Sequence, residues 1–160
     1  MKAKLVRAYM KTAATFAELS HAKRLHVGAI VVKDDRIISI GYNGMPAGWD
    51  NDCETRVYAN EWSIDNSLWD YQEEDSGVPY NLKTKPEVLH AETNAIAKLA
   101  RSSDSGLGAD LFVTHSPCLD CAKLIYQSGI SRVWYGVEYR SSDGPDFLRK
   151  SGVEVNRVDE

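Results

Sequence analysis

Apolar and polar positions follow two different periods in the first quarter of the chain. Residues 3–18 repeat apolar side chains at helical spacing, which predicts an amphipathic helix. The run 27–32 is apolar and largely β-branched, which predicts a buried strand, and 37–42 predicts the strand that returns after a polar turn. This region is therefore expected to form a helix followed by a β-hairpin.

The second half of the chain alternates between helical and extended patterns. Helices are expected over 91–101, 118–127 and 144–151, and strands over 109–114, 132–136 and 153–155. Gly129 follows the second of these helices and suits a position that caps its end. Alternating strands and helices are typical of a layered α/β fold whose strands pair in parallel.

Residues 49–89 are the least regular part of the chain. They contain Trp49, Trp62 and Trp69 among many acidic and amide side chains, and the pattern indicates one short helix near 57–62. Disordered segments are poor in aromatic residues, so we expect this stretch to be ordered. A long irregular insertion in a compact domain is usually a functional loop or lid. The tryptophans suit packing anchors better than ligand-stacking residues, and both roles stay open.

Length and composition are those of one globular domain. The 160 residues are 43% hydrophobic and 26% charged, which is ordinary for a protein that buries its own core. We expect a single domain over 1–160, with the irregular insertion at about 49–89 inside it. The formal net charge is -4, whereas nucleic-acid-binding domains are usually basic, so we expect no nucleic-acid partner.

Cysteine usage and hydropathy favour a cytoplasmic protein. The three cysteines, Cys53, Cys118 and Cys121, are too few and odd in number for a disulfide framework, and a reducing compartment fits them better. No apolar run approaches the roughly 20 residues of a membrane span. Residues 1–4 also lack the apolar core of a signal peptide. We therefore expect no membrane partner.

Two short motifs carry the candidate chemistry: His-Ala-Glu at 90–92 and Pro-Cys-Leu-Asp-Cys at 117–121. Histidine nitrogen and cysteine sulfur are favoured zinc ligands, and a catalytic zinc takes three protein ligands and keeps one position for water. His90, Cys118 and Cys121 supply such a set, and Glu92 remains as an acid and base. The two cysteines are neighbours on one helical face. At a helix start after a proline, their pKa values would be lowered towards thiolate.

Glu92 cannot share a helical face with His90, because two residues on a helix differ by roughly 200° of rotation. The metal is therefore expected over the open amino end of the helix, with His90 at or just before its cap. Zinc lowers the pKa of water towards about 7 and so makes hydrolysis feasible. Glu92, free of the metal, would carry the protons of a hydrolytic deamination.

Each motif alone has commoner meanings. A Cys-x-x-Cys pair is more often a redox pair or half of a structural zinc site, and His-x-Glu by itself carries little information. The two in this order, separated by a helix, a loop and a strand, form the signature of zinc-dependent nucleobase deaminases. Cys53 could join a second metal together with a histidine, although a single cysteine of this kind is usually buried or free.

Residues 41–48 have the sequence Gly-Tyr-Asn-Gly-Met-Pro-Ala-Gly, with three glycines and one proline. This composition indicates a shaped loop, and glycine allows the backbone to approach a ligand closely. A plain turn that leaves the preceding strand explains the composition equally well.

Taken together, these stretches resemble the deoxycytidylate (dCMP) deaminases of the zinc-dependent cytidine deaminase-like superfamily. The resemblance covers nearly the whole chain, most clearly 20–48 and 87–136. It implies conversion of dCMP to dUMP, and an α/β fold that is a three-layer α/β/α sandwich around a central mixed five-stranded sheet. It also implies a homohexamer that dCTP activates and dTTP inhibits, each together with Mg²⁺.

The resemblance implies further substrate-binding residues by their positions. Asn43 would contact the sugar or its 3′ hydroxyl, and Arg24 the phosphate. Tyr139 and Arg140 match an element near substrate and effector, and Ser116 directly precedes the cysteine motif. The implied effector-binding residues lie in the glycine loop: Gly41, Tyr42, Asn43, Gly44 and Gly48.

Some relatives carry a second, structural zinc. Here Cys53 could supply one ligand, but the segment before the first strand offers only His21 or His26 and no cysteine, so we expect no second zinc. Two other functions stay open. A deaminase of another base or of RNA shares the zinc motif, and an RNA enzyme would need a basic surface. A non-catalytic zinc-stabilised binding module would have no use for Glu92.

Overall fold

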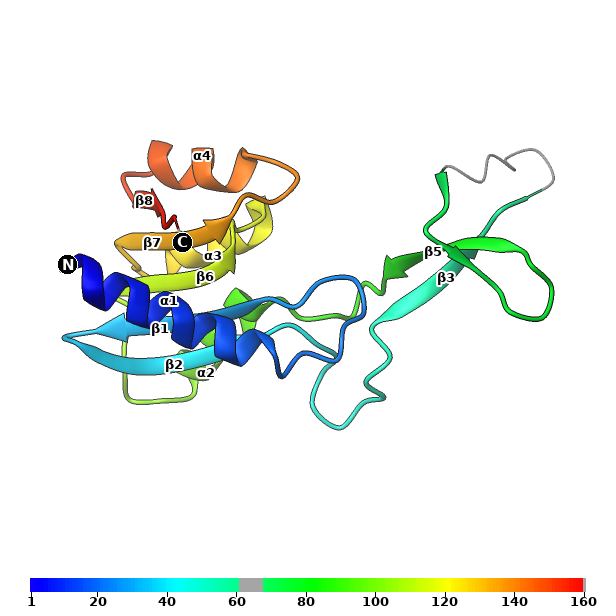
Figure 1. Ribbon diagram of the computed structural model, residues 1–160. Coiled ribbons are helices and arrows are strands. Elements are labelled where there is room, and N and C mark those ends of the chain that lie inside the picture. The colour runs from blue at the N-terminus through cyan, green and yellow to red at the C-terminus, as the bar shows by residue number, and fades with distance from the viewer. Residues whose placement is uncertain (61–67, 160) are drawn as a thin grey trace.

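The computed structural model describes residues 1–60 and 68–159, which form a layered sandwich and an arm that projects from it (Figure 1). A five-stranded sheet in the order β2-β1-β6-β7-β8 is the middle layer. Its strands in chain order are β1 (Gly28–Lys33), β2 (Arg36–Tyr42), β6 (Asp110–His115), β7 (Arg132–Val137) and β8 (Glu154–Arg157).

The central sheet is mixed. β1 pairs antiparallel with β2 and β6, whereas β6, β7 and β8 pair in parallel. The predicted hairpin is confirmed: its turn is Asp34-Asp35, and both residues have positive φ (51° and 57°), as a tight two-residue hairpin turn requires. The parallel pairing predicted for the strands of the second half of the chain is confirmed.

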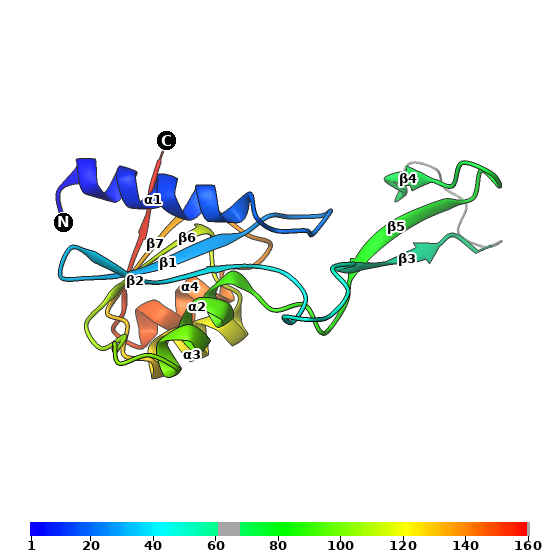
Figure 2. The ribbon, with the colours of Figure 1, turned by 90° about the horizontal axis from the view of Figure 1, so that it is seen from below.

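Helices cover both faces of this sheet (Figure 2). α1 (Ala3–Ala17) lies on one face, and α2 (Ala91–Ala100), α3 (Leu119–Gln127) and α4 (Asp143–Lys150) lie on the other. β1 is buried on both faces: Ile30 and Val32 pack in the cluster under α1, and Ala29 and Val31 in the cluster under α2 and α3. This explains its continuous apolar run and confirms the three-layer α/β/α sandwich.

The helix and strand boundaries agree with the predicted ones within about two residues. Helix α2 begins directly after His90 and α3 directly after Cys118, and these two residues are the N-caps. Gly129 follows α3 with a φ of 81°, the left-handed backbone that glycine provides at a helix end. None of the described helices is long and apolar enough to cross a membrane.

The insertion contains a second sheet, which the sequence pattern did not predict. Its strands β3 (Glu54–Tyr58), β5 (Pro79–Thr84) and β4 (Tyr71–Gln72) pair antiparallel in the order β3-β5-β4. The short helix predicted near 57–62 is wrong at Val57 and Tyr58, which belong to β3, and 61–62 lies outside the described residues. These strand residues pair with Asn81 and Tyr80, partners too distant in sequence for a local pattern to reveal.

The arm leaves the sandwich at the end of the hairpin and returns just before α2 (Figure 1). Beyond Glu54, every residue of β3 is exposed, so this sheet has little core of its own. Trp49, expected to be a packing anchor, is 58% exposed, so that expectation is wrong at this position. Trp62 lies outside the described residues. The single-domain assignment stays a prediction.

Candidate metal centre and its pocket

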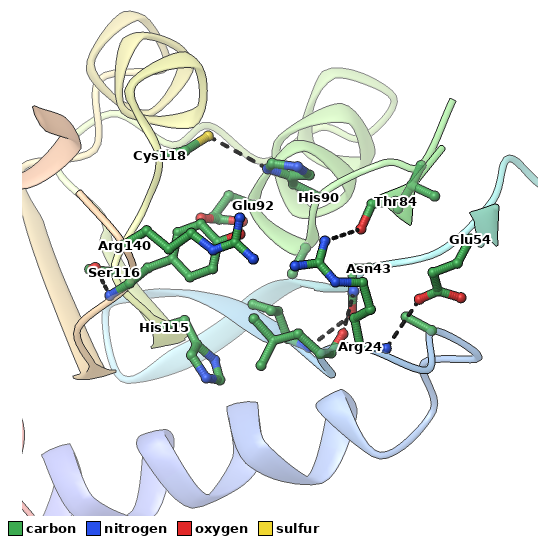
Figure 3. A pocket seen from close by; sticks show the side chains of 16 residues that line it. Arg24, Asn43, Glu54, Thr84, His90, Glu92, His115, Ser116, Cys118 and Arg140 are labelled. Carbon is green, nitrogen blue, oxygen red and sulfur yellow. Dashed lines mark hydrogen bonds between the residues drawn. The ribbon is translucent and has the colours of Figure 1, made fainter. Parts of the chain in front are cut away.

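Three candidate ligands meet at the amino ends of α2 and α3. His90 is the N-cap of α2, Cys118 is the N-cap of α3, and Cys121 lies in the first turn of α3. One ligand atom from each lies within 4.8 Å of the others. Neither N-cap side chain caps its own helix, so both are available to each other, and Figure 3 shows the imidazole of His90 facing the sulfur of Cys118.

The spacing of these side chains fits zinc. Sγ of Cys118 lies 3.6 Å and Sγ of Cys121 lies 3.3 Å from Nδ1 of His90. Zn–N and Zn–S bonds of about 2.1 and 2.3 Å at a tetrahedral angle place nitrogen and sulfur about 3.6 Å apart. Among the described residues, no other group of three His, Cys, Asp or Glu side chains has such spacing. Three ligands of this kind leave the fourth position of a tetrahedron for water.

The charges at this cluster favour a dication. Hydrogen bonding from Cys121 and His90 lowers the pKa of the Cys118 thiol to about 4, so that one sulfur is already ionised at neutral pH. The Cys118 sulfur in turn raises the pKa of His90. Cys118 and burial raise the pKa of Cys121, and a coordinated cation reverses this by favouring the thiolate.

Glu92 lies in the first turn of α2, where its side chain is only 4% exposed and lines the cavity beside His90 (Figure 3). Burial raises the pKa of its carboxyl group to about 6. A carboxyl group with a pKa this close to neutral can both accept and donate a proton at physiological pH. This is the property of an acid and base catalyst.

A cavity of about 280 Å³ extends from the metal cluster along the carboxyl ends of β6 and β7. The five residues predicted to bind substrate all line it: Arg24, Asn43, Ser116, Tyr139 and Arg140. Arg24 and Arg140 reach into the same space from opposite sides (Figure 3). The carboxyl ends of parallel strands are the usual position of ligand sites in open α/β sheets.

Hydrogen bonds hold the walls of this cavity in place. The Ser116 hydroxyl is buried and accepts a hydrogen bond from the backbone N–H of Tyr139 (2.8 Å), which fixes the segment after β7. Oδ1 of Asn43 accepts from the N–H of Val27, and its Nδ2 donates to the carbonyl of Leu25, both at 2.8 Å. These contacts tie the glycine loop to the segment that precedes β1.

Three further polar residues line the cavity that sequence reasoning did not single out: Glu54, Thr84 and His115. Thr84 accepts a hydrogen bond from Nη1 of Arg24 (3.2 Å) through its hydroxyl. His115 ends β6, and burial lowers the pKa of its imidazole. A polar residue at the carboxyl end of a predicted strand was a usable signal for His115. No signal identified Glu54 or Thr84, because their approach to the site depends on the pairing of β3 with β5.

A second cavity, also of about 280 Å³, lies beside the glycine loop. Four of the predicted effector-binding residues line it: Tyr42, Asn43, Gly44 and Gly48. Gly41 does not, since it is buried against α2, where an added Cβ would lie 2.1 Å from the carbonyl oxygen of Ala91. Asn43 lines both cavities and therefore forms part of the wall between them.

Cys53 lies apart from the metal cluster. It is buried, and its thiol donates a hydrogen bond to the carbonyl of Asn51 (3.4 Å). Burial raises the pKa of this thiol, which keeps it protonated and unreactive.

Comparison with known proteins gives a consistent pattern. The family model of the cytidine and deoxycytidylate deaminase zinc-binding region matches residues 3–137. The deoxycytidylate deaminase of Enterobacteria phage T4 is 38% identical over 155 residues, which cover 82% of this chain and 78% of the phage protein. The Homo sapiens deoxycytidylate deaminase is 35% identical over 137 residues, 84% of this chain and 66% of the human protein.

Solved structures match nearly the whole chain, and one of them contains ligands. The dCMP deaminase of the cyanophage S-TIM5, crystallised in complex with dCMP and dUMP, superposes with a TM-score of 0.79. The two sequences are 44% identical, and the match covers 99% of each chain. Sequence and backbone therefore agree over the region that carries the metal cluster and the cavity.

Proposed function

This chain belongs to the cytidine and deoxycytidylate deaminase family, and on that premise we propose that it hydrolyses dCMP to dUMP and ammonia. The observation that carries the proposal is one cavity that borders the zinc-type ligand set, through His90 and Cys118, and is also lined by the buried Glu92 and two arginines. Such a cavity suits a small anionic ligand with a reactive ring. The relative from cyanophage S-TIM5 was crystallised with dCMP and dUMP.

The proposed mechanism assigns the proton transfers to Glu92. His90, Cys118 and Cys121 would hold the zinc, which activates a water molecule for attack on the ring. Glu92 accepts a proton from the attacking water and passes it to N3 of cytosine. It then takes the proton of the new hydroxyl group on C4 and delivers it to the amino group, which leaves as ammonia when the C4–N bond breaks. Because burial raises the pKa of Glu92 to about 6, the carboxyl group can perform both transfers near neutral pH.

The two arginines account for a phosphorylated substrate. Arg24 and Arg140 enter the cavity from opposite sides, and Arg24 is oriented by its hydrogen bond to Thr84. A guanidinium group binds phosphate oxygens through charge-assisted, often bidentate hydrogen bonds. Each such contact contributes about 1.5–3 kcal/mol, so two of them favour a nucleotide strongly over its nucleoside.

A substrate panel tests this proposal. The loss of cytosine absorbance should be followed for dCMP, deoxycytidine, dCTP, CMP and a cytosine-containing RNA oligonucleotide. We expect kcat/KM for dCMP to exceed that for deoxycytidine by at least about 100-fold, from two contacts of about 1.5–3 kcal/mol each. Equal rates on both would indicate a nucleoside deaminase, and a preference for the oligonucleotide would indicate a nucleic-acid enzyme.

We also propose that the enzyme is a cytoplasmic homohexamer that Mg²⁺–dCTP activates and Mg²⁺–dTTP inhibits. The second cavity supports an effector site, because the glycine loop lines it and Asn43 belongs to both cavities. A ligand bound there could shift Asn43 and so alter substrate affinity. Rate curves against dCMP with and without each Mg²⁺–triphosphate test the regulation, and light scattering tests the hexamer.

A further inference from the structure

Glu54 is a buried carboxylate with one oxygen that lacks a protein partner. It begins β3, at the base of the arm, and is 4% exposed. Oε1 accepts hydrogen bonds from the backbone N–H groups of Lys23 (2.8 Å) and Arg24 (3.2 Å). Oε2 is buried and has no hydrogen-bond partner within the described part of the chain. A buried acceptor without a donor is costly, and Glu54 lines the substrate cavity, so a bound ligand is the natural donor.

The chemistry of dCMP leaves one group to fill this role. A carboxylate accepts hydrogen bonds and repels phosphate, so the donor must be a hydroxyl or amino group. The 4-amino group of the base belongs at the reacting end, beside Glu92 and the metal ligands. Glu54 lies at the opposite end, next to Arg24 and Asn43 (Figure 3). The remaining donor of dCMP is the 3′ hydroxyl of its sugar.

Asn43 supplies the complementary half of such a contact. Its amide nitrogen carries two hydrogens, and one of them is donated to the carbonyl of Leu25. The second hydrogen can be donated to the oxygen of the 3′ hydroxyl, while the hydroxyl hydrogen goes to Glu54. A hydroxyl group both donates and accepts, so it satisfies the two residues at once.

We propose that Oε2 of Glu54 accepts a hydrogen bond from the 3′ hydroxyl of the substrate and makes the enzyme specific for nucleotides in which that hydroxyl is free. This inference rests on the proposed function. A cytidine inside a polynucleotide carries a 3′ phosphodiester, which lacks the donor and places a negative charge against a buried carboxylate. The zinc motif also occurs in deaminases that act on nucleic acids. Glu54 therefore limits the substrates of this enzyme to free nucleotides.

The test compares dCMP with 2′,3′-dideoxy-CMP and with deoxycytidine 3′,5′-bisphosphate on the zinc-loaded enzyme. A site built to bind a hydroxyl strongly rejects an analogue without it, so we expect kcat/KM to fall by at least about 30-fold for both analogues. Glu54→Gln keeps an oxygen for the Lys23 and Arg24 amides but presents an N–H₂ donor to the substrate. In this variant the preference for dCMP over the dideoxy analogue should shrink to less than about fivefold, chiefly through a loss of dCMP activity.

Asp52→Asn is the matched control, since Asp52 lies two residues away, pairs with Lys85 and does not line the cavity. It should leave the preference unchanged. The proposal is overturned if wild-type enzyme uses both analogues as well as dCMP, or if Glu54→Gln lowers kcat/KM for dCMP and the dideoxy analogue equally. An equal loss on both substrates would mean that Glu54 only accepts the backbone hydrogen bonds of Lys23 and Arg24 and does not contact the substrate.

Calorimetric titration with the products, dUMP and 2′,3′-dideoxy-UMP, separates this proposal from the proposed function. The dissociation constant of dUMP should be lower than that of 2′,3′-dideoxy-UMP, and this comparison requires no turnover. A protein that binds dUMP at least about 30-fold more tightly than 2′,3′-dideoxy-UMP but does not deaminate dCMP would contradict the proposed function and support the role of Glu54. Equal dissociation constants would contradict the role of Glu54 whatever the activity.

Discussion

His90 and Glu92 are two positions apart, yet both reach the same cavity. This is feasible because His90 is not a helical residue: as the N-cap of α2 it has an extended backbone, with φ of -77° and ψ of 156°. Cys118 has the same kind of backbone at the start of α3. In both motifs the first residue can therefore face the site only because it precedes the helix. For His90 the sequence predicts this position, since two residues on a helix differ by roughly 200° of rotation.

The residues that line the cavity divide into predictable and unpredictable ones. The candidate metal ligands and Glu92 belong to short motifs whose residue types suit a definite chemistry, so the sequence alone identifies them. Glu54 and Thr84 belong to no motif, and they reach the cavity because β3 and β5 pair at residues 30 positions apart. The tertiary fold determines which distant residues come together in this way, and no local sequence pattern reveals such pairs.

Arg24→Ala and Arg140→Ala test phosphate recognition. Each should lower kcat/KM for dCMP by about 10- to 100-fold, the equivalent of one charge-assisted contact of about 1.5–3 kcal/mol. Activity on deoxycytidine should stay unchanged, because the nucleoside has no phosphate to lose. Steady-state assays on both substrates measure this. Lys23→Ala is the control, because Lys23 is a neighbouring positive residue that does not line the cavity, and it should leave both activities unchanged. If the arginine variants lose activity on dCMP and on deoxycytidine to the same extent, the assignment of phosphate binding is wrong.

His115 gives the protein a predictable response to acid. Burial lowers the pKa of its imidazole in the folded state, so below the ordinary value of about 6.5 the unfolded chain binds more protons. Its contribution to the free energy of unfolding is therefore complete above about pH 6.5 and is lost as the pH falls through the lowered pKa. Urea unfolding of wild type and His115→Asn at pH 7.5 and 5.5 should show a smaller pH dependence in the variant. If the free energy of unfolding falls equally between the two pH values in wild type and variant, the prediction is contradicted.

At the scale of elements, the close contact between β2 and α2 fixes the position of α2, the helix at whose start the proposed catalytic residues lie. Gly41 of β2 lies directly under α2, where a Cβ would be 2.1 Å from the oxygen of Ala91 and 2.7 Å from the nitrogen of Ala95. Gly41→Ala should lower the free energy of unfolding by about 2 kcal/mol or more and weaken zinc binding, because α2 carries His90 and Glu92.

Gly44→Ala is the matched control for this contact. Gly44 lies in the same loop, but nothing is within 4 Å of an added Cβ, so the change should be within about 0.5 kcal/mol. Chemical denaturation and zinc titration measure both effects. If the two variants behave alike, the packing of β2 against α2 does not position the site.

The regular elements of the sandwich are predictable because their patterns are local. β1 is a continuous apolar run because it is buried on both faces, and α1 repeats its apolar residues at helical spacing because it covers one face. The strands of the arm differ: β4 and all of β3 beyond Glu54 are exposed and β5 is mostly half-buried, so none of them alternates between buried and exposed residues. Their structure depends on pairing with distant residues, and the predicted helix near 57–62 is wrong for this reason.

At the scale of the whole molecule, the sandwich carries the candidate site, and of the described residues of the arm only those at its base line it. No described residue between Val57 and Asn81 lines either cavity. Because Arg56 pairs with Leu82, replacing 57–81 by Asn-Gly would close the arm with a two-residue hairpin turn. We expect this variant to unfold cooperatively and to keep zinc and dCMP turnover within about tenfold of wild type. Loss of folding would show that the arm is part of a single cooperative unit.

The central claim is that three side chains hold a zinc and that Glu92 moves the protons. Glu92→Gln tests it, with the zinc content and dCMP turnover of wild type and variant measured on the same preparations. We expect one zinc per chain in both proteins and a loss of turnover by about 10²–10⁴-fold in the variant, the usual contribution of a general acid and base. A variant that deaminates dCMP at nearly the wild-type rate, or a wild-type protein that is active without zinc, would contradict the account.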